Sequence, residues 1–126
     1  MAGVGNPPRT FKTKWFSRAA RKALISDSDL CEAIEQVRKG QADDLGGGVY
    51  KKRLDKNRYR SIIVAKSGPL WIYEYLFAKK DRDNIAADEL DAFRRLADGY
   101  AGLNADQLQQ LLNGRDLTEI CNEGQA

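Results

Sequence analysis

Three strand-like runs joined by short turns constrain this chain more than any other feature of its sequence. The runs are Val49 to Leu54, Tyr59 to Lys66 and Leu70 to Ala78, separated by only four and three residues. Connections this short join antiparallel neighbours, because a parallel pair needs a crossover of about a dozen residues or more. The third run is almost continuously apolar, which indicates a strand at the centre of a sheet. The middle of the chain therefore predicts an antiparallel sheet.

The segments before this sheet predict one strand and two helices. Arg9 to Trp15 alternates between apolar and basic side chains, which is typical of a strand, and Phe16 to Lys22 predicts a short helix. Ser26 followed by Asp29 is a capping-box pattern that opens a longer helix, and Gly40 ends it. We expect residues 41–48 to be a loop. Its three glycines are not a phosphate-binding P-loop, because no Gly-Lys-Ser/Thr follows them.

The acidic C-terminal part predicts two more helices. Ala87 to Tyr100 repeats apolar residues at helical spacing, and Asn104 with Gln107 opens a second helix that Gly114 ends. Helices on either side of a run of strands predict an α+β fold, with an antiparallel β-sheet, helices packed on one face, and the order β-α-α-β-β-β-α-α. We expect residues 1–8 to be disordered and residues 9–126 to form one domain with a C-terminal helical extension.

The residue types and motifs that the sequence lacks exclude several kinds of catalytic and metal-binding site. The chain has no histidine, which excludes Ser-His-Asp and Cys-His triads and most zinc sites. Cys31 and Cys121 form no CxxC pair, so we expect both to be free thiols in a reducing cytosol. No run is long and apolar enough to span a bilayer, and the N-terminus lacks the apolar core of a signal peptide. The expected location is therefore the cytoplasm.

The net charge of +3 conceals a division of the chain into a basic and an acidic part. From Met1 to Arg82 there are 18 Lys and Arg against 9 Asp and Glu, a net charge of +9. From Asp83 to Ala126 there are 3 against 9, a net charge of −6. Such a division favours a polyanionic partner for the basic part. The alternative is that the charges are scattered over solvated faces.

Basic side chains concentrate on the predicted sheet. On its first strand, alternation places Lys51 and Arg53 on one face and Lys52 on the other. Further cations lie in the following turn, on the next strand and after the last strand: Lys56, Arg58, Arg60, Lys79, Lys80 and Arg82. Antiparallel pairing would bring these groups together as a phosphate-binding surface. The alternative is an edge hairpin that carries Lys and Arg for solubility alone.

Aromatic side chains could add contacts with bases. Trp71, Tyr73, Tyr75 and Phe77 alternate along the last strand, so the pattern predicts that they share one face. Such a stripe more often packs as core beneath helices, and we expect most of it to be core. Tyr59, which precedes Arg60, is a better candidate for a contact with a base or ribose.

Three motifs in this order resemble the RelE/HigB group of toxins, within the RelE/ParE superfamily, from bacterial type II toxin–antitoxin systems. The motifs are the run from Gly46 to Arg53, the pair Tyr59-Arg60 that opens the next strand, and the run from Phe77 to Ile85. The opening segment 11–16 and the tail 108–120 are also similar to one subfamily of that group. The resemblance covers residues 9–120 and implies the fold expected above.

The resemblance implies a toxin that a cognate antitoxin holds inactive. It also implies a ribosome-dependent mRNA endoribonuclease, an mRNA interferase that inhibits translation without a metal or other cofactor. Its partners would be the antitoxin, mRNA and the ribosome, with no membrane involved. The ribose 2′-OH would attack the adjacent phosphate, leaving a cyclic phosphate and a 5′-OH. Two alternatives stay open: a DNA gyrase inhibitor like the ParE branch, and a module that binds RNA or the ribosome without cleaving.

The family's functional positions carry over onto five catalytic candidates, Lys51, Arg53, Arg60, Lys80 and Arg82. The resemblance implies that Arg60 and Lys80 hold the scissile phosphate, while Lys51 or Arg53 assists proton transfer or the leaving group. The RNA-binding candidates are Lys52, Lys56, Arg58, Tyr59 and Lys79. Some relatives use a Tyr or His near the end of the site, where this chain has the segment 84–86, Asn-Ile-Ala. A general acid or base would therefore come from elsewhere.

Overall fold

The computed structural model describes residues 7–66 and 68–122. Their strands form a six-stranded sheet with the order β2-β3-β4-β5-β1-β6. The strands are β1 (Arg9–Thr13), β2 (Asp43–Gly46), β3 (Val49–Leu54), β4 (Tyr59–Val64), β5 (Leu70–Ala78) and β6 (Leu117–Ile120). β3, β4 and β5 pair as consecutive antiparallel neighbours. The antiparallel sheet that their short connections predict is therefore confirmed.

Four helices in the described residues flank this sheet. They are α1 (Lys14–Lys22), α2 (Asp27–Arg38), α3 (Ala87–Ala101) and α4 (Ala105–Asn113). Capping boxes at Ser26 and Asn104 open α2 and α4, as predicted. The Thr13 hydroxyl accepts a hydrogen bond from the Phe16 backbone N–H, so α1 begins at Lys14. The predicted strand, which extended to Trp15, is therefore two residues too long.

Two short strands extend the sheet beyond the prediction. β2 lies in the segment 41–48, expected to be a loop, and pairs antiparallel with β3. β6 follows α4 and pairs antiparallel with β1, while β1 pairs in parallel with β5. Each of the two has only four residues, too few to carry a clear period of two. The C-terminal extension, expected to be helical, contains α4 and then this strand.

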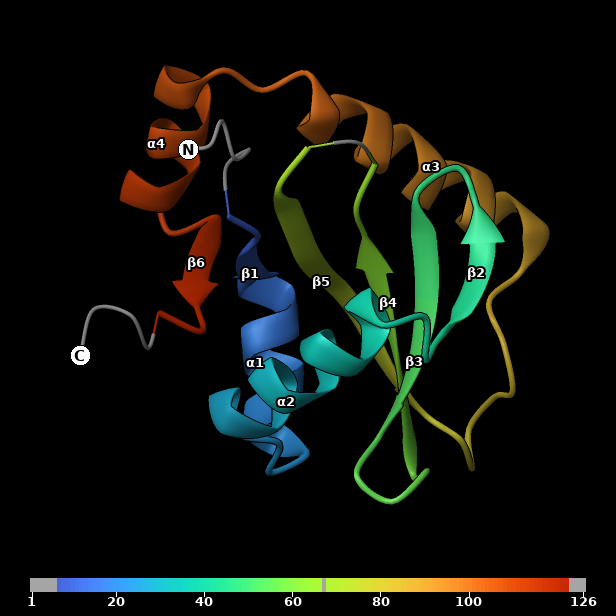
Figure 1. Cartoon of the computed structure of the whole chain (residues 1–126). Helices are drawn as coiled ribbons and strands as arrows, with labels where there is room; N and C mark the ends of the chain where they lie inside the picture. The colour runs from blue at the N-terminus through green and yellow to red at the C-terminus, as the bar shows by residue number, and fades with distance from the viewer. Residues whose placement is uncertain (1–6, 67, 123–126) are drawn as a thin grey trace.

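The helices cover the sheet on two faces, which we call the α2 face and the α3 face. Phe16, Leu30 and Ile34 from α1 and α2 pack in one core cluster, and residues of α3 and α4 pack with Val49 and Ile62 in another. Figure 1 shows α1 and α2 in front of the sheet and α3 behind it. The predicted α+β class is confirmed, and α1 and α2 pack on one face as expected. α3 adds a layer on the other face.

A β-bulge in β5 divides the predicted aromatic stripe between the two faces. The register between β4 and β5 shifts at Glu74, which is an extra residue on β5. Before the bulge, Tyr73 packs in the core of the α2 face. Beyond it, Tyr75 and Phe77 pack on the α3 face. The prediction of a single aromatic face is therefore wrong, because one inserted residue reverses the alternation.

The two cysteines form a disulfide, so the prediction of free thiols is wrong. Cys31 lies on α2 and Cys121 follows β6, and their Cα atoms are 5.4 Å apart despite a sequence separation of 90. The pairing of β6 with β1 brings the C-terminal part of the chain back to the α2 face, where both cysteines pack against the core. Strand order creates this proximity, and the spacing of two cysteines in a sequence does not reveal it.

Arg94 on α3 holds the β2–β3 turn against this helix by hydrogen bonds. Its guanidinium donates hydrogen bonds to the carbonyls of Leu45 at 2.6 Å and Gly46 at 3.2 Å. Gly47 lies under this side chain with a φ of +67°, and a Cβ there would come within 2.7 Å of the Arg94 Cγ. Glycine therefore satisfies both the positive φ and the close approach.

Two further expectations concern the membrane and the N-terminus. In the part of the chain that the structure describes, no helix combines the length and apolar composition that crossing a bilayer requires. Of the segment 1–8, expected to be disordered, residues 1–6 lie outside the described residues. The cytoplasmic location stays a prediction.

Candidate nucleic-acid interface

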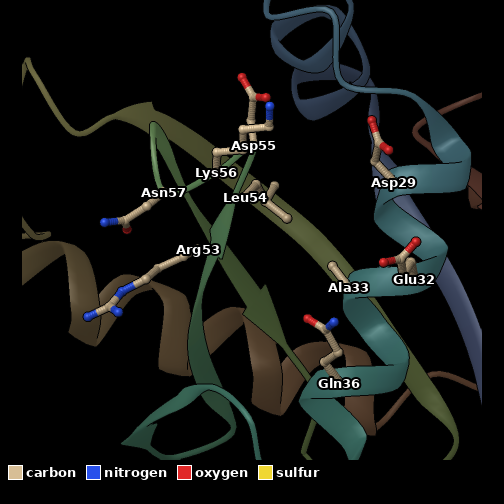
Figure 2. Close-up of a pocket in the computed structure, with 9 residues that line it drawn as sticks. All are labelled: Asp29, Glu32, Ala33, Gln36, Arg53, Leu54, Asp55, Lys56 and Asn57. Atoms are coloured by element: carbon tan, nitrogen blue, oxygen red, sulfur yellow. The ribbon is translucent and has the colours of Figure 1, made fainter.

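The predicted cations of β3 and β4 meet on the α3 face of the sheet. Arg53 lies directly opposite Arg60, and Arg60 lies directly opposite Phe77 on β5. Arg60 shares its face with Ile62, which packs in the core cluster of α3. Figure 2 shows the Arg53 side chain directed away from α2. Opposite residues on one face have Cβ atoms about 4.5–5.5 Å apart, so two guanidinium groups start from neighbouring positions.

The two arginines differ in exposure, and no acid among the described residues balances their charges. Arg60 is only 7% exposed, and its Nη1 donates to the carbonyls of Asn57 at 3.0 Å and Tyr59 at 3.4 Å. Arg53 is exposed. Neither forms an ion pair within residues 7–66 and 68–122. Like charges directly opposite destabilise a sheet, and an anion bound between them would relieve the repulsion.

Arg82, in the loop between β5 and α3, lies over Phe77, the β5 residue opposite Arg60. Its guanidinium carbon lies 5.5 Å from the centre of the Phe77 ring, and its Nη1 donates to the Tyr75 hydroxyl at 3.5 Å. The same group hydrogen-bonds to Glu89, on the first turn of α3. This bond raises the pKa of Arg82 and lowers the pKa of Glu89. We call Arg53, Arg60 and Arg82 the guanidinium row.

Lys51 lies beside the guanidinium row on the same face of β3. It stands two residues before Arg53 and opposite Ile62, which is itself opposite Tyr75. Its ammonium group pairs with the carboxylate of Asp43 on β2, with an Nζ–Oδ2 distance of 3.7 Å. Lys51 is therefore the lysine among the catalytic candidates that shares a face with Arg53, although an acid already balances its charge.

The other candidates gather at the tip of the β3–β4 hairpin. A cavity of about 640 Å³ opens between this turn and the loop after β5. Its lining includes five of the predicted residues, Lys56, Arg58, Tyr59, Lys79 and Lys80. The Lys79 N–H donates to the Arg58 carbonyl at 2.9 Å, which joins the two segments. Lys80, expected to hold the scissile phosphate beside Arg60, thus lines a cavity to which Arg60 does not contribute.

Lys52 lies on the opposite face, as the alternation of β3 predicts. Its Nζ donates to the Gln41 carbonyl at 3.0 Å, and burial, with the neighbouring charge of Arg53, lowers its pKa. The cavity of about 560 Å³ between α2 and the β3–β4 hairpin is lined by the acids Asp29 and Glu32 (Figure 2). The same cavity is also lined by Arg53, Asp55 and Lys56, so its lining carries both signs of charge. Lys52 itself lies on the face of β3 opposite to Arg53.

Two aromatic side chains at the site, Tyr75 and Phe77, were predicted to lie on the other face of β5, and Glu89 was not predicted as part of the site. The strict alternation of β5 assigns the two aromatic rings to the face of Trp71, and only the bulge moves them beside Arg82. Acids are common in the first turn of any helix, so nothing in the sequence marks Glu89 as the partner of Arg82. Among the described residues, no group of three or more His, Cys, Asp and Glu could hold a metal ion.

The fold and the guanidinium row define a small α+β domain with arginine side chains grouped on one face of its sheet. The family model for the RelE toxin of the RelE/RelB toxin–antitoxin system matches residues 8–120. The chain therefore belongs to the RelE toxin family, as its motifs indicated. Membership makes it the toxin of a toxin–antitoxin system and implies an antitoxin partner. A search of curated proteins found no significant match.

Proposed function

We propose that this toxin is an endoribonuclease that cleaves mRNA on the ribosome and thereby inhibits translation. The observation that carries the proposal is the pair Arg53 and Arg60, whose like charges lie opposite each other with no ion-pair partner among the described residues. Local arrangements that cost stability tend to occur at functional sites. RNA supplies the anion that such a pair can bind, and the guanidinium fork matches the geometry of a phosphate.

The proposed reaction is an internal transfer of the phosphate. The ribose 2′-OH loses its proton, and its oxygen forms a bond to the adjacent phosphorus. The bond from phosphorus to the 5′ oxygen of the next nucleotide breaks, and that oxygen takes up a proton. The products are a 2′,3′-cyclic phosphate and a 5′-OH. The crowded intermediate carries extra negative charge, which preorganised cations stabilise.

The residues of the guanidinium row suit different parts of this reaction. Arg60 is buried and held by two carbonyls, so it can present a fixed donor to a phosphate oxygen. Arg53 is exposed and can approach the same phosphate from the next strand. Arg82 can contribute once RNA competes with Glu89 for its guanidinium. Lys51 is the candidate for assisting proton transfer, since it lies beside the row.

A reconstituted cleavage assay tests this function. End-labelled mRNA is incubated with the toxin in free form and on translating ribosomes, with and without EDTA once ribosome integrity is controlled for. The proposal predicts cuts on ribosomes, with cyclic phosphate and 5′-OH ends, that EDTA does not abolish. Clean ribosome binding without cuts would instead indicate a blocking module. Neither cuts nor binding would contradict the proposal and favour gyrase inhibition.

A further inference from the structure

Trp15 presents a large aromatic ring to solvent at the start of α1. Its residue is 49% exposed, whereas most aromatic residues of the described chain are buried or half-buried. One side of the ring rests on Tyr75, with ring centres 5.0 Å apart and planes inclined by 32°. The first turn of α1 holds it there, because the Thr13 cap fixes where the helix begins. The exposed ring is therefore supported from behind and leaves surface free for a ligand.

A chain of contacts connects Trp15 to the guanidinium row. Tyr75, behind Trp15, accepts a hydrogen bond from Arg82 and lies 5.7 Å from Phe77 between ring centres. Phe77 lies under the Arg82 guanidinium and opposite Arg60. The aromatic rings therefore extend from the guanidinium row outward to Trp15. A nucleotide whose phosphate lies on the row would have a flat aromatic surface close to its base.

The surroundings of Trp15 favour a nucleic acid over an apolar protein segment. Lys14 precedes it, and Arg18 lies three residues further on α1, where side chains are neighbours on a helix; both are exposed. Leu24, the nearest in sequence of the other exposed large hydrophobic residues, lies beyond the other end of α1. A lone aromatic ring flanked by cations is the arrangement that stacks an unpaired base while neighbouring charges attract its backbone.

We propose that Trp15, supported by Tyr75, is a stacking site for an unpaired nucleobase of the RNA bound at the guanidinium row. The inference rests on the proposed function, since it assigns the base next to the phosphate that the row would hold. Stacking tolerates any base, because every base has a flat face. Trp15 would thus add affinity and position the strand without selecting a sequence.

Fluorescence of Trp15 tests the stacking directly. The chain has two tryptophans, so Trp71→Phe leaves Trp15 as the single emitter. This protein is titrated with a 2′-O-methyl RNA hexamer, which cannot be cleaved, and with an abasic hexamer that has the same phosphates. Stacking predicts quenching by the first hexamer and little by the second. Equal responses to both, or no response to either, would overturn the stacking site.

Binding by variants separates stacking from charge. With a fluorescein-labelled hexamer, Trp15→Leu is expected to weaken binding about tenfold, and Trp15→Phe much less, since phenylalanine still stacks. Trp15→Leu should leave the salt dependence of binding unchanged, whereas Arg53→Gln should reduce its slope by about 0.7. Affinity of Trp15→Leu equal to that of the wild type would overturn the inference. The inference would also be overturned if Trp15→Leu weakened the binding of the abasic hexamer by the same factor, because the loss of affinity would then come from a change in the fold.

The two proposals can fail separately. Suppose that the toxin cleaves mRNA on ribosomes normally, but the fluorescence of Trp15 does not respond to RNA and Trp15→Leu binds RNA as tightly as the wild type. The stacking site would then be contradicted, and the nuclease proposal would stand. Trp15 would then be a surface for a protein such as the antitoxin. If RNA that carries bases quenches Trp15 but the toxin cleaves no mRNA, the stacking site is supported and the nuclease proposal is contradicted. Because Trp15 is exposed, we expect Trp15→Leu to fold, and the titration of the single-tryptophan protein does not depend on that variant.

Discussion

Arg53 and Arg60 are the residues at which function and stability oppose each other. They occupy opposite positions on β3 and β4, and no described acid pairs with either. A sheet selected for stability alone would place an acid or an uncharged residue at one of the two positions. The repulsion is tolerable in free protein because Arg53 is exposed and water screens its charge.

The substitution Arg53→Gln should therefore preserve or raise stability. It removes one of two like charges at an exposed position, and cross-strand pairs of this kind contribute roughly 0.2–1 kcal/mol. Urea unfolding should give a free energy equal to that of the wild type or higher by about that amount. Arg95→Gln, at an exposed position on α3, is the matched control and should leave the free energy unchanged. A clear loss of stability in Arg53→Gln alone would show that Arg53 supports the fold.

Glu74, the bulge residue of β5, gives a pH dependence whose sign can be worked out. Burial raises the pKa of its carboxyl above the ordinary 4.5, and the hydrogen bond from the Tyr100 hydroxyl opposes this in part. The folded protein thus holds this proton more tightly than the unfolded chain. Stability contributed by the protonated group is present below about pH 4.5 and is lost as pH rises through the higher folded pKa.

Glu74→Gln should flatten that dependence. The glutamine carbonyl can still accept from Tyr100, and no charge is buried at neutral pH. We expect a higher Tm than the wild type at pH 7, and a difference that shrinks as the pH is lowered toward 4.5. Thermal unfolding by circular dichroism across this range measures it. A variant that melts below the wild type at pH 7 would contradict the sign.

At the scale of elements, the helices were predictable from local sequence and the sheet edges were not. Capping residues at Ser26 and Asn104 set the helix starts by contacts three residues apart, which a sequence displays. β2 and β6 are strands because each pairs with a neighbouring strand. A segment of four residues is too short to show the apolar–polar alternation that would predict a strand from sequence. The bulge at Glu74 is likewise a property of the register between two strands.

The β2–β3 turn offers a test of one such element. Gly48 has a φ of +86°, and a Cβ there would lie 2.6 Å from the Lys66 Cβ and 3.1 Å from the Ala65 carbonyl oxygen. Gly40 has a similar φ of +89° with open space around it. Gly40→Ala should cost about 1 kcal/mol from backbone strain alone, and Gly48→Ala should cost clearly more because a clash is added. Equal losses in urea unfolding would contradict the close approach.

At the scale of the whole molecule, the disulfide joins α2 to the segment after β6. It closes a loop with a sequence separation of 90, so it restricts the unfolded chain strongly. Reduction, or Cys121→Ser, should lower the unfolding free energy by about 2–5 kcal/mol. The stability of the Cys121→Ser protein should not respond to reductant, which serves as the control. Equal stability of the oxidised and reduced wild-type protein would contradict this role.

The candidate site shows the same limit of sequence reasoning. The alternation of β3 predicted that Lys51 and Arg53 share a face, and antiparallel pairing predicted that cations of neighbouring strands meet. The structure places Arg53, Arg60 and Arg82 together but leaves Lys80 at the hairpin tip. Which cations meet depends on register and on the loop after β5, and both are set by contacts between distant segments.

The cleavage rate of Arg53→Gln on translating ribosomes is the most direct test of the guanidinium row as the phosphate site. It is measured beside the wild type and Arg95→Gln, with all three proteins shown to be folded. We expect Arg53→Gln to cleave about 10–100 times more slowly, the loss that corresponds to one hydrogen bond to a charged group, and Arg95→Gln to cleave at the wild-type rate. Full activity of Arg53→Gln would contradict the assignment and place the reaction elsewhere on the molecule.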